Sequence, residues 1–161
     1  MTHQVNALSV AAMASNVESV RAAYRAAEGD VRDLKGWRDS FTEDGVFNMM
    51  STGDSYRGEQ LDDVLTYMWG VFPDVHRELL QVHDLGQNLV AVQLLIQGTF
   101  LGPFPTPAGP LAPNGAKTSV PAADIFHLRD GKIQTFDCYP MMNIRMAQMG
   151  VTFDFASAVH R

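Results

Sequence analysis

The chain has 161 residues, of which 46% are hydrophobic and 19% charged, a globular composition with the size of one domain. Its net charge of −6 disfavours partners such as nucleic acid or an anionic membrane surface. The lone cysteine, Cys138, excludes an intramolecular disulfide and a zinc site of the CxxC type. This suits a cytoplasmic protein, although a secreted bacterial protein can also lack disulfides. The sequence has no run of about 20 apolar residues, so we expect no transmembrane helix.

The two ends of the chain are expected to lie outside the domain. Residues 1–16 carry no Lys or Arg ahead of their apolar part, and polar residues interrupt that part, so they do not fit a signal peptide. We expect an N-terminal tail at residues 1–16. The patterned region predicts one domain over residues 17–151, followed by a C-terminal tail at residues 152–161.

The first half of the patterned region favours helices. Apolar residues at helical spacing predict a helix over Val17–Arg38, with Asn16 as a plausible N-cap and Gly29 as a point where the helix breaks or restarts. A short extended piece follows at Gly45–Met50. A second helix is predicted over Gly58–Trp69, because its apolar residues share one face.

After Pro73 the apolar period changes from helical spacing to two, which is typical of strands. Asp130-Gly131 favours a tight type I′ hairpin, and the Pro- and Gly-rich stretch over Gly102–Gly115 predicts a long loop at the rim of a pocket. The predicted strands are His76–Asp84, Leu89–Leu101, Lys117–Leu128 and Ile133–Tyr139, with a closing helix at Met142–Met149.

Helices followed by an antiparallel meander indicate an α+β fold. Strands of this length curl, and helices that cover the open side of a curled sheet leave a concave apolar pocket. The pattern therefore predicts a cone-shaped α+β barrel, in which a curved mixed or antiparallel sheet wraps around the N-terminal helices and encloses a small-molecule cavity.

Asp124 is the best candidate for a catalytic group. It interrupts the apolar stretch Val120–Phe126, where burial of an ionised carboxylate is costly and raises the pKa of the group. A raised pKa suits a general acid or an oxyanion donor near neutral pH; the alternative is a carboxyl that is merely hydrogen-bonded in the core. Asp137 is a second candidate, although alternation with Phe136 and Cys138 turns it outward unless a β-bulge intervenes.

Other side chains are candidates for the pocket wall. Cys138 on the inward face is more often a small core residue than a nucleophile. His76, His83 and His127 show no metal-ligand spacing, so we predict neither a metal nor a cofactor. Aromatic residues, which alternatively form plain core, are expected to line a site for a flat hydrophobic ligand. They are Tyr24, Tyr67, Trp69, Phe100, Phe126 and Tyr139.

The order and spacing of several segments resemble the SnoaL-like polyketide cyclase (ester cyclase) branch of the nuclear transport factor 2-like superfamily. The resemblance covers roughly Ala22–Val151 and implies the fold of ketosteroid isomerase and limonene epoxide hydrolase. It is a poor guide to function, because this fold hosts many activities. The segments are Phe41–Phe47 (FTEDGVF), Phe72–Val75 (FPDV), Leu85–Val92 (LGQNLVAV), Gly98–Gly102 (GTFLG), Asp124–Ile133 (DIFHLRDGKI) and Gln148–Val151 (QMGV).

The resemblance also implies roles for individual positions. Asp124 matches the aspartic acid of the isomerase oxyanion hole. The position of the isomerase base falls on Asn48 or Met49, which are not bases, and Asn48 is kept as a substrate-binding candidate. Cys138 and Met141 stand where many relatives place aspartates. Lys117-Thr118-Ser119 replaces the Arg–Asp pair of the epoxide hydrolases, which weakens that assignment.

The sequence favours a cofactor-free acid–base enzyme that cyclises or isomerises a hydrophobic, carbonyl-bearing small molecule, with Asp124 and Asp137 as catalytic candidates. The alternatives are a non-catalytic binding protein on the same fold and an epoxide hydrolase with a rearranged dyad. A Gln-bearing outer sheet face suggests a homodimer.

Overall fold

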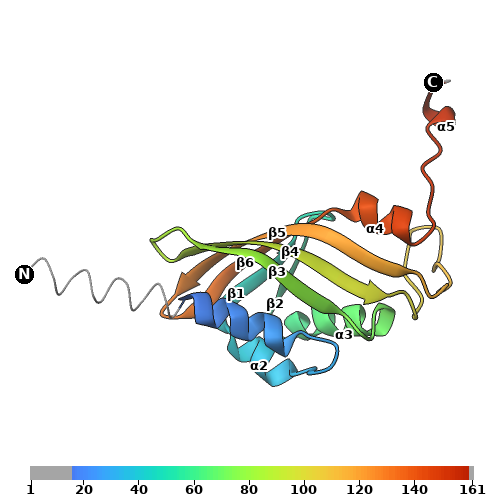
Figure 1. Cartoon of the computed structure of the whole chain (residues 1–161). Helices are drawn as coiled ribbons and strands as arrows, with labels where there is room; N and C mark the ends of the chain where they lie inside the picture. Colours follow the sequence, from blue (N-terminus) through green and yellow to red (C-terminus); the bar gives the residue numbers. More distant parts are fainter. Residues whose placement is uncertain (1–15, 160–161) are drawn as a thin grey trace, which may run out of the picture.

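The computed structural model describes residues 16–159 and consists of helices packed on one mixed sheet (Figure 1). Residues 16–26 are helical and belong to the first helix. The other helical elements are α2 (Leu34–Asp39), η1 (Gly58–Gln60), α3 (Leu61–Val71), α4 (Met142–Gln148) and α5 (Ala156–Val159). The strands are β1 (Phe41–Met49), β2 (Asp54–Arg57), β3 (His76–Asp84), β4 (Leu89–Thr99), β5 (Lys117–Arg129) and β6 (Lys132–Pro140).

The six strands form one curved, unclosed sheet in the order β2-β1-β6-β5-β4-β3. Neighbouring strands are antiparallel except β1 and β6, which run parallel. The first helix, α2 and α3 lie on one side of this sheet (Figure 1). The α+β architecture expected from the sequence is confirmed, and the space between sheet and helices is where the apolar core and the cavity lie.

Period-two alternation determines which side of each central strand is buried. Val90, Val92 and Leu94 of β4 face the helices, whereas Gln93 between them is exposed, as the sequence pattern predicts. The same alternation continues through β5 and places Asp124 on the buried face. The β5–β6 hairpin turns at Asp130 and Gly131, whose φ angles of 52° and 74° belong to the left-handed region that Asp-Gly favours.

The helix predicted over Val17–Arg38 is in fact two helices. It breaks at Gly29, where a Cβ atom would lie 2.4 Å from the Pro73 carbonyl oxygen, so only glycine allows this approach of the two segments. Asn16 is not a cap but a helical residue, and its side-chain amide donates a 3.0 Å hydrogen bond to Asn88 Oδ1.

Two tryptophans fix the helices to each other through their indole N–H groups. Trp37 of α2 donates to the Leu61 carbonyl at 2.8 Å, and Trp69 of α3 donates to the Ala27 carbonyl at 3.0 Å. Both rings are buried, so these bonds satisfy donors that would otherwise be unpaired in the core.

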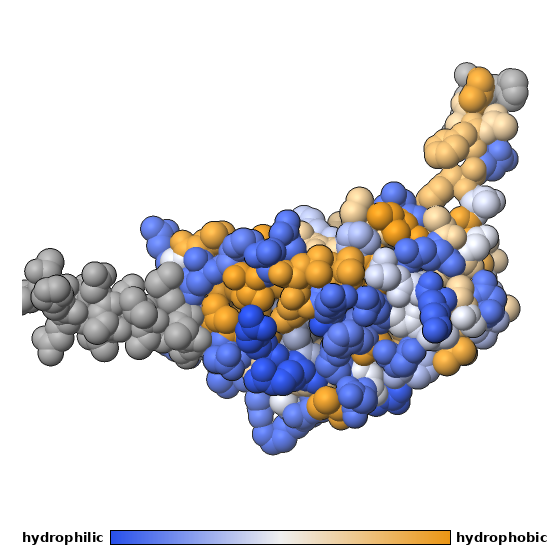
Figure 2. Space-filling model, in the orientation of Figure 1, coloured by the Kyte–Doolittle hydropathy of each residue, from blue (hydrophilic) through white to orange (hydrophobic). Residues whose placement is uncertain are grey.

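The predicted tail at residues 1–16 lies outside the described residues, apart from Asn16. At the other end, the segment with α5 extends away from the body of the protein and exposes Phe153 and Phe155 (Figure 1). Hydrophobic side chains also gather in a band over the sheet (Figure 2). Within residues 16–159 no helix has the length and apolarity needed to cross a bilayer. Homodimerisation and a cytoplasmic location stay predictions.

Candidate functional site

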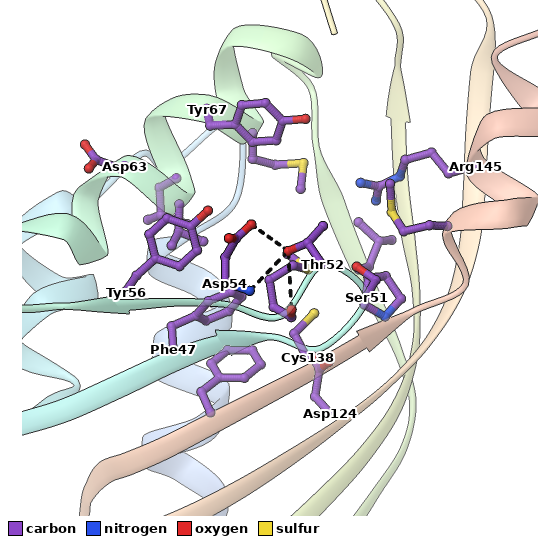
Figure 3. Close-up of a pocket in the computed structure, with 18 of the residues that line it drawn as sticks. Phe47, Ser51, Thr52, Asp54, Tyr56, Asp63, Tyr67, Asp124, Cys138 and Arg145 are labelled. Carbon is purple, nitrogen blue, oxygen red and sulfur yellow. Dashed lines mark hydrogen bonds between the residues drawn. The ribbon is translucent and has the colours of Figure 1, made fainter. Parts of the chain in front are cut away.

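A cavity of about 540 Å³ lies between the sheet and the helices (Figure 3). That volume is within the range of small-molecule sites, roughly 300 to 1,000 Å³. Half of the residues that line it are aromatic or sulfur-containing: Tyr24, Trp37, Phe47, Tyr56, Tyr67, Phe104, Phe136, Met49, Met68, Met142, Met146 and Cys138. The charged residues of its wall are Asp54, Asp63, Arg77, Asp124 and Arg145.

Asp124 lies at the inner end of this cavity, in the middle of β5 and opposite Cys138 of β6. Its side chain is 1% exposed. The Tyr24 hydroxyl donates a 2.7 Å hydrogen bond to Asp124 Oδ2, whereas Oδ1 accepts no well-formed hydrogen bond from any described residue. The Tyr24 hydroxyl therefore holds one carboxyl oxygen in place, whereas the other has no well-formed hydrogen bond.

The pKa of Asp124 is raised from 3.8 to about 6 because burial disfavours the ionised carboxylate. The Tyr24 hydroxyl, the Cys138 thiol and the charge of Arg77 act in the opposite direction but do not cancel the effect of burial. A carboxyl with this pKa exchanges its proton near neutral pH, which suits a general acid or base.

Tyr24 comes from the first helix and is positioned by its ring. Its edge-to-face contacts with Phe126 and Phe136 have centroid separations of 5.6 and 6.0 Å. Burial, followed by the charge of Asp124, raises the pKa of the phenol well above 10. Tyr24 therefore stays protonated and acts as a fixed hydrogen-bond donor to the carboxyl.

Cys138 faces the same cavity but is not an activated nucleophile. Burial, followed by the charge of Asp124, raises the pKa of its thiol well above 9. A nucleophilic cysteine needs a lowered pKa, so the thiol acts as a small apolar wall group beside Asp124.

Two arginines line the cavity, and neither was predicted from the sequence. Arg77 of β3 donates to the Ala27 carbonyl at 2.9 Å and forms an ion pair with Glu28 at 3.4 Å. Arg145 of α4 is 3% exposed, and its guanidinium carbon lies 5.2 Å from the centroid of the Phe72 ring. Arg145 is the one charged residue in the short helix Met142–Gln148, which was a usable signal.

The structure brings together four of the ten residues predicted for the site: Asp124, Tyr24, Tyr67 and Cys138 all line the cavity. Asp137 and Asn48 lie on the opposite face of the sheet, where Asn48 Nδ2 donates a 2.7 Å hydrogen bond to Asp137 Oδ1. No bulge turns Asp137 inward, because β6 pairs regularly with β5 at this point.

The other four predicted residues are aromatic and do not line the cavity. Trp69, Phe100 and Phe126 are buried behind the wall, and Tyr139 is 45% exposed on the outer face. Period and composition identify an apolar face, but they do not show which ring borders the cavity and which packs in the layer behind it. Among the residues that the structure describes, no three His, Cys, Asp or Glu side chains form a group that could hold a metal ion.

The sequence of residues 20–136 matches the profile of the SnoaL-like domain, and this match spans most of the chain. The chain belongs to the SnoaL-like domain family. No curated protein matches its sequence. The match confirms the resemblance to this family that the segments between Phe41 and Val151 carry.

Solved structures share the fold at low sequence identity. A protein from Jannaschia sp. CCS1, assigned as a SnoaL-like polyketide cyclase without an established activity, is 23% identical, with 87% of this chain and 94% of that chain covered and a TM-score of 0.71. A phenazine biosynthesis-related protein from Pseudomonas aeruginosa is 20% identical, with coverages of 90% and 86% and a TM-score of 0.73. A protein with a ketosteroid isomerase-like fold from Catenulispora acidiphila, solved in complex with trimethylamine, is 20% identical, with coverages of 84% and 94% and a TM-score of 0.69.

Proposed function

We propose that this SnoaL-like protein is a cofactor-free acid–base enzyme that cyclises or isomerises a hydrophobic, carbonyl-bearing small molecule. The observation that carries the proposal is Asp124, a fully buried carboxyl with a pKa of about 6 at the inner end of an apolar cavity. The naming of similarly folded proteins as polyketide cyclases supports the same class of reaction.

The expected chemistry is proton transfer at a carbonyl compound. In its ionised form Asp124 takes a proton from the carbon next to the carbonyl and leaves an enolate; in its protonated form it returns that proton to carbon or to the oxygen. Tyr24 holds Oδ2 and thereby orients the carboxyl. The aromatic wall excludes water, which strengthens these electrostatic interactions.

A second candidate function is ligand binding without turnover. The observation that favours it is the enclosure of Asp124, whose Oδ1 atom is buried as well as unpaired. A substrate reaches this oxygen only if the wall beside it, including Cys138, shifts by a small amount. A purely structural carboxyl needs no such access.

Deuterium exchange separates the two functions without knowledge of the natural substrate. The α-hydrogens of 2-tetralone, a bicyclic hydrophobic ketone, are followed by NMR in D₂O with and without the protein. An acid–base enzyme accelerates the exchange, and Asp124→Asn lowers the rate by about 10²- to 10⁴-fold, the usual contribution of a positioned acid or base.

The matched control is Asp130→Asn, which makes the same chemical change in the exposed β5–β6 turn and should leave the exchange rate unchanged. Equal rates for the wild type and Asp124→Asn would refute the acid–base role. Saturable binding of 2-tetralone with exchange at the buffer rate would establish the binding function instead.

A further inference from the structure

We propose that the ligand of the cavity carries a carboxylate group and that Arg145 binds it. This inference deepens the proposed function and rests on it only in taking the cavity as a ligand site; it does not require turnover. Its basis is a buried guanidinium on the cavity wall that no carboxylate of the described residues neutralises.

The surroundings of Arg145 leave its hydrogen-bonding groups free. Among residues 16–159, none accepts a hydrogen bond from its side chain or forms an ion pair with it, and Nε is wholly enclosed without a partner. The two Nη atoms also lack partners but are not enclosed, so they keep access to the cavity. Figure 3 shows the guanidinium pointing from α4 into the cavity, on the side of Tyr67, Thr52 and Ser51.

Stability alone does not explain this arrangement. A buried arginine is normally paired, and an unpaired one costs free energy that its contact with Phe72 offsets only in part. Arg77 shows the usual solution in the same cavity, because Glu28 neutralises it. A cation that is buried, unpaired and directed at a cavity is the arrangement expected of a site whose counter-charge arrives with the ligand.

The cavity selects the kind of anion. A guanidinium presents a planar pair of N–H donors that matches a carboxylate. On the same helix, Met142 and Met146 add apolar surface to the wall beside Arg145. Asp54 and Asp63 are exposed residues that line the cavity, and their negative charge disfavours an anion with two charges such as a phosphate monoester. The expected ligand is a flat hydrophobic molecule with a single carboxylate.

Two probes of the same shape test this inference by calorimetry: 2-naphthoate, which carries a carboxylate, and 2-naphthamide, which does not. The wild type should bind 2-naphthoate at least about tenfold more tightly. Arg145→Met should lose this preference and bind the amide within about threefold of the wild type. Arg145→Lys should keep part of it, and Arg25→Met, which removes an exposed arginine of the first helix, should keep all of it.

Thermal unfolding without ligand distinguishes a binding role from a structural one. If Arg145 is kept for binding, Arg145→Met unfolds at the same or a higher temperature than the wild type, because an unpaired buried charge has been removed. A clear fall in Tm would indicate a structural role and overturn the inference. Equal affinities of the wild type for both probes, no binding of 2-naphthoate up to millimolar concentrations, or an unchanged preference in Arg145→Met would overturn it as well.

The two proposals fail in distinguishable ways. If the protein does not accelerate hydrogen exchange in 2-tetralone, the carboxylate preference still stands, because binding of the naphthalene probes involves no reaction. If the protein shows no preference for 2-naphthoate over 2-naphthamide, the role of Asp124 in the exchange assay still stands, because 2-tetralone carries no carboxylate.

Discussion

The substitution Asp124→Asn should change how the stability of the protein depends on pH. In the wild type the folded state holds the proton of Asp124 with a pKa of about 6, whereas the ordinary value is 3.8. A raised pKa means that the carboxyl contributes its full share of stability below pH 3.8. That share is lost as the pH rises through about 6, because ionising the buried group then opposes folding.

The size of the effect follows from the displacement of the pKa. A displacement from 3.8 to about 6, at about 1.4 kcal/mol for each tenfold change in proton affinity, corresponds to roughly 3 kcal/mol. Between pH 4 and 7.5 the wild type should lose roughly 2 to 3 kcal/mol of unfolding free energy that Asp124→Asn does not lose. Asparagine keeps an acceptor for the Tyr24 hydroxyl and cannot ionise, so it imitates the protonated acid.

Urea denaturation at half-unit steps of pH measures this difference. Trp37 and Trp69 are both buried, so their fluorescence reports global unfolding. Other titrating groups act on both proteins alike and cancel in the difference between them. Parallel stability profiles for the wild type and Asp124→Asn would refute the raised pKa, and an equal change in Asp130→Asn would show that burial is not its cause.

Three further outcomes are expected. Tyr24→Phe removes a hydrogen bond that lowers the pKa of Asp124, so the midpoint of the same stability profile should move to higher pH. The unfolding free energy should also fall by about 1 kcal/mol. An unchanged midpoint would contradict this prediction. The Cys138 thiol should react with a disulfide reagent at pH 8 in urea but not in the folded protein, and equal rates would be incompatible with its burial. Gly102→Ala should lower the unfolding free energy measured in urea by at least about 3 kcal/mol, because the new Cβ would lie 1.8 Å from the Gly70 carbonyl oxygen. Gly70→Ala is the control: a Cβ there meets open space, so this variant should be neutral or stabilising.

The strands β3 to β6 could be predicted within one or two residues because the exposure of their side chains alternates along the chain. One face of β4, β5 and β6 is buried, and one face of β3 is half-buried. The pair β1–β2 could not be predicted in this way. β2 has four residues, is largely exposed and lies at the sheet edge, so it has no apolar alternation to detect. The predicted extended piece at Gly45–Met50 is only part of β1, which begins at Phe41. Its parallel pairing with β6 joins segments about 90 residues apart, and local periodicity carries no information on such pairing.

The sequence predicts those features of the candidate site that depend on the alternation of side chains between the two faces of a strand. The pattern of β5 and β6 correctly placed Asp124 and Cys138 on one face and Asp137 on the other. The partner of Asp124 was not predictable as such, because Tyr24 is 100 residues away and reaches the carboxyl only through the packing of the first helix on the sheet. The sequence could have singled out Arg145 as the one charged residue of its short helix, but the absence of a partner among residues 16–159 is visible only in the structure.

The two proposed roles are electrostatically coupled, and the coupling is measurable. With a pKa of about 6, Asp124 is about nine-tenths ionised at pH 7 in the empty cavity. A carboxylate ligand brings a second negative charge into the same cavity and displaces water, and both effects favour the protonated form of Asp124. Were its pKa to rise from about 6 to about 7, the protein would take up about 0.4 proton for each ligand bound at pH 7.

Calorimetric titration with 2-naphthoate in buffers of different ionisation enthalpy gives this number directly. Uptake should fall to near zero in Asp124→Asn while the carboxylate preference remains, since Arg145 is unaltered in that variant. Proton release on binding, or the same uptake in the variant, would show that Asp124 is not the group that responds. Proton uptake that occurs only in the wild type would mean that ligand binding protonates Asp124. The carboxyl would then hold the proton that a general acid must deliver.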